Sequence, residues 1–158
     1  MKRLLTFALA TLVIASTSAA FGADHSLGTW KLNPEKSKYS PGPLPVKSIT
    51  AVREAADNGV KVTTTGERSD GSAINTTYTA KFDGSPASLS GQGAPYDTIS
   101  LKQVNANTFT YEAKNSSTKY HANGKLVISA DGKTMTMKAK GTDADGKPMD
   151  VTLVYDKQ

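Results

Sequence analysis

The sequence contains no cysteine and only two histidines among its 158 residues. The absence of cysteine excludes disulfide bonds, thiolate metal ligands and a cysteine nucleophile, so the hydrophobic core must stabilise the fold alone. A zinc site needs about three or four converging ligands, and His25 and His121 are far apart in the chain. The sequence therefore predicts neither a metal site nor a bound cofactor.

Arginine is also rare, and the positive charge is spread along the chain. The formal net charge is +5, and it falls to +3 if Lys2 and Arg3 are removed with an export signal. The arginines that then remain, Arg53 and Arg68, each stand beside a glutamate. A nucleic-acid binder needs a concentrated basic patch with interleaved aromatic residues. We therefore expect no nucleic-acid partner.

Motifs that would indicate an enzyme are missing as well. Neither a glycine-rich phosphate loop nor a Gly-x-Ser-x-Gly elbow is present. The segment from Asp143 to Gly146 resembles the start of a calcium loop, but Lys147 takes a ligand position and Pro148 the position of the required glycine. A hairpin turn is the better interpretation. No catalytic residue is assigned, and an enzyme ranks third among the possible functions.

The hydrophobic run at the start of the chain is too short to span a membrane. It extends over the twelve residues from Leu4 to Ala15, whereas a transmembrane helix needs roughly 18. Basic residues precede it and small residues follow it, which is typical of a secretory signal peptide. Cleavage after Ala20 or Gly22 would separate a signal peptide (1–22) from one domain (23–158). We expect a periplasmic or secreted protein without a lipid anchor, because no cysteine follows the run.

The rest of the chain has the pattern of an all-β protein. Runs of β-branched and aromatic residues alternate with turn signals such as Asp57-Asn58-Gly59 and Asp131-Gly132, which supply the positive φ of tight hairpins. Runs of about 8 to 10 residues between such signals are typical of antiparallel sandwiches and barrels. The expected strands are 27–32, 46–56, 60–67, 73–82, 97–104, 108–114, 119–129, 133–141 and 148–156.

Two segments interrupt the series of hairpins. Residues 33–38 can form one helical turn with Asn33 as the N-cap, and residues 83–95, rich in Gly, Ser and Pro, are expected to cross an end of the sheet. About nine neighbouring strands would leave two open edges in a flat sheet. Closing into an up-and-down barrel of calycin or lipocalin type removes these edges. A β-sandwich is the alternative.

The first expected strand carries a resemblance to a known family. Gly28-Thr29-Trp30 resembles the Gly-x-Trp that opens lipocalins and related calycin barrels, which implies that Trp30 plugs one end. The sequence departs from that pattern because Lys157, not an arginine, stands on the last strand. Uncharacterised short secreted bacterial proteins are more similar. They share the Gly-Thr-Trp-Lys-Leu-Asn-Pro opening, the segment 96–102 and the hairpin 131–136, and the resemblance implies structural roles for Gly28 and Trp30 but no activity.

The faces expected to point inward mix a few large residues with many small ones. Barrels of this strand number can enclose one small ligand, and aromatic rings beside flexible methionines suit an amphipathic guest. The candidate ligand-binding residues are Tyr78, Phe82, Phe109, Tyr111, Tyr120, Met135 and Met137. The same residues can instead fill a tapered core.

Two functions from different classes follow from this pattern. The first is a monomeric, exported carrier of a small apolar or amphipathic molecule, which would use the inward residues. The second is an envelope protein-interaction module, such as a stress factor or a hydrolase inhibitor, which would use the exposed hairpins and the proline-rich loop at 40–45.

Overall fold

The computed structural model describes residues 24–158, so the predicted signal peptide and its cleavage site lie outside the described residues. Twelve antiparallel strands make up the domain. Their bounds are β1 Gly28–Leu32, β2 Lys38–Ser40, β3 Val46–Ala56, β4 Gly59–Arg68, β5 Ala73–Lys81, β6 Asp83–Ser88, β7 Ser90–Gln92, β8 Thr98–Asn105, β9 Thr108–Lys114, β10 His121–Ile128, β11 Thr134–Thr142 and β12 Pro148–Lys157. Among these residues no helix is long and apolar enough to cross a membrane.

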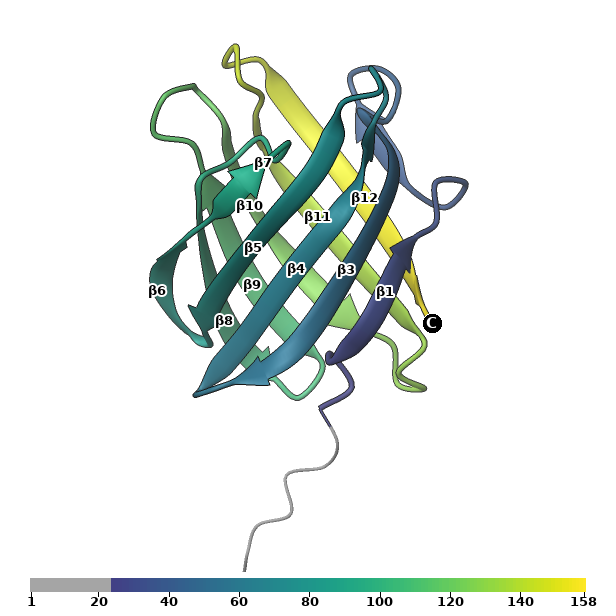
Figure 1. Cartoon of the computed structure of the whole chain (residues 1–158), viewed down its shortest axis with the longest axis vertical. Coiled ribbons are helices and arrows are strands. Elements are labelled where there is room, and N and C mark those ends of the chain that lie inside the picture. Colours follow the sequence, from purple (N-terminus) through teal and green to yellow (C-terminus); the bar gives the residue numbers. More distant parts are fainter. Residues whose placement is uncertain (1–23) are drawn as a thin grey trace, which may run out of the picture.

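The strands form one sheet that curls into a nearly closed barrel (Figure 1). Their order is β6-β8-β9-β10-β11-β12-β1-β3-β4-β5-β7, with β2 attached to β12. The short strand β1 joins the half of the sheet that ends in β12 to the half that begins with β3. Its residue Trp30 pairs with Lys157 of β12 and with Ala51 of β3. The predicted all-β antiparallel barrel is thus confirmed.

The connection after β5 covers the seam of the barrel instead of crossing its end. β6 pairs with β8, and β7, two residues later, pairs with β5, so one segment bridges the two edges of the sheet. Gly91 has a φ of +103°, and a Cβ there would lie 2.0 Å from the carbonyl oxygen of Asn75. The glycines that indicated a loop in the sequence therefore allow this close backbone approach.

All nine expected strands are present, and the bounds of β3 and β9 agree with the prediction. The three additional strands, β2, β6 and β7, lie in segments that were expected to be connections. Residues 34–36 form a turn that is not helical, and Asn33 caps it as expected, since the amide of Lys36 donates to the side-chain oxygen of Asn33 at 3.2 Å. The turn leads into β2, which pairs with β12 along residues 38–40.

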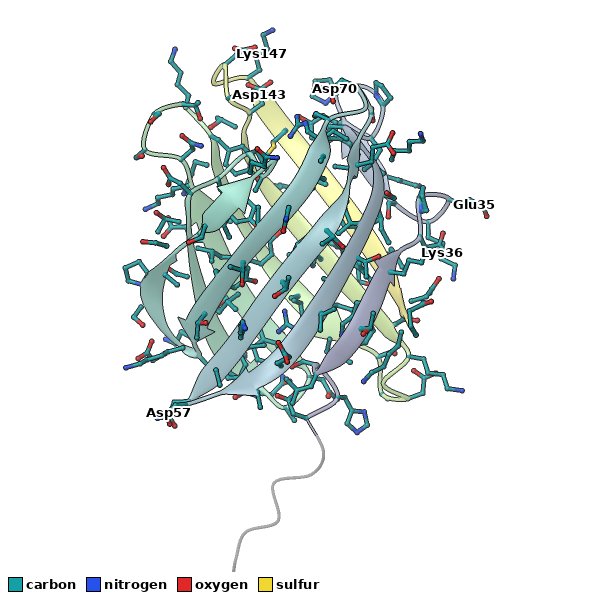
Figure 2. The ribbon with its side chains drawn as sticks, viewed as in Figure 1. Glu35, Lys36, Asp57, Asp70, Asp143 and Lys147 are labelled. Carbon is teal, nitrogen blue, oxygen red and sulfur yellow. The ribbon has the colours of Figure 1, made fainter. Side chains whose placement is uncertain are left out.

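The two ends of the barrel differ in their packing. The end that carries the Asp57 turn is here called the closed end, and the opposite end, with Asp143 and Lys147, the tyrosine end (Figure 2). Near the closed end, Trp30, Ile128 and Met135 are at most 2% exposed. Around the tyrosine end, a separate small cluster joins Ala122, Ala139 and Met149. Most of the largest fully buried side chains therefore gather toward Trp30, while alanines line part of the opposite end beside the buried Ile99 of β8.

Candidate functional site

Trp30 and a short N-terminal segment plug the closed end. The indole Nε1 of Trp30 donates to the carbonyl oxygen of Ser26 at 3.0 Å, and Trp30 is 0% exposed. Lys157 Nζ lies 5.0 Å from the centroid of the indole ring and donates to the carbonyl oxygen of His25 at 3.1 Å. A lysine on the last strand thus covers the tryptophan through a cation–π contact.

Arg53 lies beside this plug on the inward face of β3. It is 4% exposed, and its Nε donates to the same Ser26 carbonyl oxygen at 2.9 Å. Its Nη2 has no hydrogen-bond partner among the described residues, and neither does the hydroxyl of Ser26. Burial lowers the pKa of Arg53, but a guanidinium stays protonated at neutral pH. The interior therefore contains a positive charge that the chain only partly satisfies.

Tyrosine side chains extend from the level of Arg53 to the tyrosine end. Tyr78 and Tyr155 are 8% and 4% exposed, and the rings of Tyr96 and Tyr120 stack with centroids 6.2 Å apart. Burial raises the pKa of Tyr96, and the charges of four other tyrosines, Tyr78 and Tyr155 included, raise it further. The phenols therefore converge on a shared interior region.

The pKa values of the other interior phenols change in the same direction. Burial raises the pKa of Tyr120 to about 12, and it also raises the pKa values of Tyr78, Tyr111 and Tyr155. The charge of Arg53 opposes this rise at Tyr78 and Tyr155. At neutral pH these phenols are neutral groups that can donate or accept hydrogen bonds.

Small side chains surround the rings at the tyrosine end. Ala122 pairs with Ala113 of β9 and with Gly141 of β11, so three adjacent strands present almost no bulk at this level. Tyr39, Tyr111 and Tyr120 pack against the small cluster of this end. The arrangement joins flat aromatic surfaces to a patch of small side chains, which the buried Ile99 of β8 borders through its pairing with Ala113.

The structure divides the seven predicted ligand-binding residues into two groups. Phe109 and Met135 are fully buried, and Phe82 packs on Phe109 with ring centroids 4.9 Å apart. Met137 packs against the same core at partial burial. Tyr78 is a member of this core too, whereas Tyr120 packs against the small cluster of the tyrosine end and Tyr111 packs against both clusters.

Sequence reasoning missed three members of this phenol group and the arginine below it. Tyr96 follows the segment expected to be a connection, Tyr155 lies on the expected strand 148–156 but was not assigned to the site, and Tyr39 precedes the first long strand. Arg53 was interpreted as a surface charge beside Glu54. Its alternation with the buried Ile49 and Ala51 is the signal that could have identified it as inward-facing.

A broad hollow of about 810 Å³ lies outside the barrel, on the outer face of β10, β11 and β12. Its lining includes Lys125, Lys138 and Thr136. Lys125 and Lys138 stand directly opposite each other in the sheet register. This open surface on the outer face of the sheet is separate from the tyrosine-lined interior.

These observations define an antiparallel β-barrel with one end plugged by tryptophan and an interior lined by phenols. No family model and no curated protein matches the sequence. The structure is similar to EF1p2_mFAP2b bound to DFHBI, with a TM-score of 0.51 and 13% identity over 86% of this chain and 96% of that chain. It is also similar to the redesigned beta barrel mFAP1 bound to DFHBI, with a TM-score of 0.45 and 13% identity over 85% and 96%. At this identity the likeness shows the fold alone.

Proposed function

We propose that this protein binds a small apolar or amphipathic molecule inside its barrel, as a carrier of lipocalin type. The observation that carries the proposal is the uneven filling of the interior. Aliphatic and aromatic bulk packs the half around Trp30. In the other half, strands β3, β5 and β8 contribute the buried Ile49, Ile74 and Ile99, while strands β9, β10 and β11 combine phenol rings with Ala113, Ala122 and Ala139. A core built only for stability would place branched aliphatic side chains on these three strands as well.

The comparison with solved barrels supports the proposal. EF1p2_mFAP2b, which has a similar fold, is described as bound to the small molecule DFHBI. Barrels of about eight or more strands have interiors that are either filled by side chains or open to one small ligand. Flat aromatic walls with a few polar groups are the usual lining of such sites.

We also propose that the carrier acts outside the cytoplasm. The proposal rests on the basic start, the short apolar run and the small residues before Ala23. Intact-mass measurement of the protein from a periplasmic extract should give a chain that begins at Phe21 or Ala23. A mass that still includes residues 1–20 would contradict export by a cleaved signal.

The binding proposal is tested by filling the tyrosine end. An environment-sensitive fluorescent fatty acid should bind wild-type protein saturably. Ala122→Trp should abolish this binding, because Ala122 is 1% exposed and faces the interior of the barrel. Circular dichroism should show that the strands remain, since overpacking costs about 1–3 kcal/mol.

Val127→Trp is the matched control, because Val127 lies on the same strand but is 42% exposed on the outer face. It should bind the probe as the wild type does. If the wild type shows no saturable binding of any apolar probe, the carrier proposal is wrong. The protein-interaction module then becomes the leading function.

A further inference from the structure

The carrier proposal leaves open which class of molecule enters the barrel, and the buried arginine bears on this question. Arg53 is the only arginine, lysine, aspartate or glutamate that is fully buried among residues 24–158. Its Nε is held by the carbonyl oxygen of Ser26, but its Nη2 has no hydrogen-bond partner. An uncompensated buried charge is unfavourable by several kcal/mol. Such a group in a native structure calls for a partner.

The described chain does not supply an acidic partner. None of the ion pairs among residues 24–158 includes Arg53. The carboxylate whose charge acts on it is that of Asp24, which is exposed. Its Oδ1 already accepts a hydrogen bond from the amide of Ser26 at 2.9 Å. The positive charge of Arg53 therefore has no ion-pair partner among the described residues.

Polar groups that suit an anion stand beside the guanidinium. Arg53 pairs with Val62 of β4, and Val62 pairs with Tyr78 of β5, so Arg53 and Tyr78 share the inward face two strands apart. The phenol of Tyr78 interacts with the guanidinium, and Tyr155 lies within reach of its charge. Phenols and a guanidinium can all donate to one carboxylate or phosphate group.

The interior on the other side of this cluster suits an apolar chain. From Tyr78 the phenol group continues through Tyr111 to the stacked rings of Tyr96 and Tyr120. Ala122 and its small neighbours on adjacent strands lie at that end. A molecule with one charged end and an apolar body would match this order of polar and then apolar side chains along the barrel.

We propose that the ligand is an amphipathic acid, with its anionic head bound by Arg53 and Tyr78 and its apolar chain among the rings of the tyrosine end. This inference rests on the proposed carrier function and deepens it. A buried water molecule would satisfy the Nη2 hydrogen bond but would leave the charge uncompensated. An acid would satisfy both, so the two occupants predict different ligand preferences.

The test compares ligands that differ only in the head group. Isothermal titration calorimetry of wild-type protein with dodecanoate, dodecyl phosphate and dodecanol keeps the chain constant and changes the charge. We expect at least one of the acids to bind about tenfold or more tightly than the alcohol, as charge-assisted hydrogen bonds typically allow. Comparing the two acids distinguishes a carboxylate from a phosphate head group.

Variants then locate the effect. Arg53→Gln should reduce acid affinity to that of dodecanol, and Arg53→Lys should retain part of the preference. Tyr78→Phe removes one hydroxyl with little change of shape and should weaken acid binding severalfold while leaving dodecanol binding unchanged. Circular dichroism checks that each variant is folded. If Arg53→Gln does not fold, the ligand series on the wild type and Tyr78→Phe still decides the question.

The outcomes separate this inference from the carrier function. Equal affinity of the wild type for the acids and the alcohol would overturn the anion site and leave the carrier function standing. The absence of binding by all three ligands would overturn both. An acid preference that persists in folded Arg53→Gln would also overturn the assignment to Arg53.

Discussion

The closed end and the tyrosine end of this barrel use the same sheet for different purposes. At the closed end, Trp30 and Phe109 are 0% exposed, and the plug is held by a shared carbonyl oxygen and a lysine over the indole. At the tyrosine end, half-buried rings such as Tyr111 and Tyr120 lie against alanines. The closed end therefore holds most of the large apolar side chains together with the buried charge of Arg53, and the tyrosine end combines phenols with small side chains.

The difference shows how a small barrel without disulfides can combine stability with an adaptable interior. Burial of bulky side chains contributes about 1.5–3 kcal/mol for each large apolar residue, so the half around Trp30 is expected to dominate the free energy of unfolding. Phenols bury aromatic surface as well, but each hydroxyl needs a partner inside. At the tyrosine end, the phenol hydroxyls can therefore replace hydrogen bonds within the protein by hydrogen bonds to a bound ligand.

The largest effect on stability is expected at alkaline pH, where the phenol groups ionise. Burial raises the pKa of Tyr120 from 10.0 to about 12, and the pKa values of Tyr78, Tyr96, Tyr111 and Tyr155 are raised as well. A group whose pKa is higher in the folded than in the unfolded protein contributes its full stabilisation at pH values below its unfolded pKa. This stabilisation is lost as the pH rises through the folded pKa. Each buried phenol should thus lower stability by about 1.4 kcal/mol per pH unit above 10.

We therefore expect cooperative unfolding between pH 10 and 12, the unfolded and folded pKa values of Tyr120. Circular dichroism and near-ultraviolet phenolate absorbance should change together on the same samples. The denatured chain is the control, and its phenols should titrate near their ordinary pKa. Phenolate formation near pH 10 in a protein that keeps its strands would show that the phenols contact water, and the contrast between the two ends would fail.

The second prediction removes the plug at the closed end. Trp30→Ala should destabilise the protein by about 3–5 kcal/mol, because a large, fully buried aromatic side chain and its hydrogen bond to Ser26 are lost. Urea unfolding followed by circular dichroism measures the change. Val104→Ala is the control, since Val104 is 60% exposed and its loss should change stability by less than about 0.5 kcal/mol. A loss under roughly 1 kcal/mol for Trp30→Ala would show that the plug does not hold the fold.

The strands were predictable because their signal is local. Alternation and turn residues located all nine long strands. Because a flat sheet would leave two strand edges unpaired, closure into a barrel was favoured. The strands β6 and β7 were not predictable, because glycine, serine and proline have low strand propensity and these residues pair only with partners distant in sequence, on β8 and β5. Tertiary pairing decided their structure.

The candidate site was only partly predictable for a related reason. Alternation places Tyr78 and Tyr111 on inward faces, but it does not show how far along the barrel each residue lies, since that depends on the register and tilt of every strand. Alternation therefore grouped Phe109 and Met135 with Tyr120, although the first two pack in the core around Trp30 and Tyr120 packs against the separate cluster of the tyrosine end. Arg53 was missed because arginine is rarely buried, so composition favoured a surface role over its position in the alternation.

The smallest effect is expected on the outer face, where an ion pair sits opposite the phenol-lined interior. The carboxylate of Glu112 lies 2.9 Å from His121 Nε2 and 2.9 Å from Lys114 Nζ. Hydrogen bonds from His121 and Lys114 lower the pKa of Glu112 below 4.5. A lowered folded pKa stabilises the protein above the unfolded pKa, and this effect disappears as the pH falls through the folded pKa.

Glu112→Gln should therefore lower the free energy of unfolding by no more than about 1 kcal/mol at pH 7, because the pair is solvent-exposed. The difference between variant and wild type should shrink as the pH falls below 4.5, the ordinary pKa of the carboxyl. Urea unfolding at pH 7 and at a pH below 4.5 measures this difference in stability. Glu35→Gln is the control, because Glu35 is an exposed glutamate outside these ion pairs. A larger and pH-independent loss would mean that Glu112 supports β9 by packing rather than by charge, and that the outer face contributes to the fold as the closed end does.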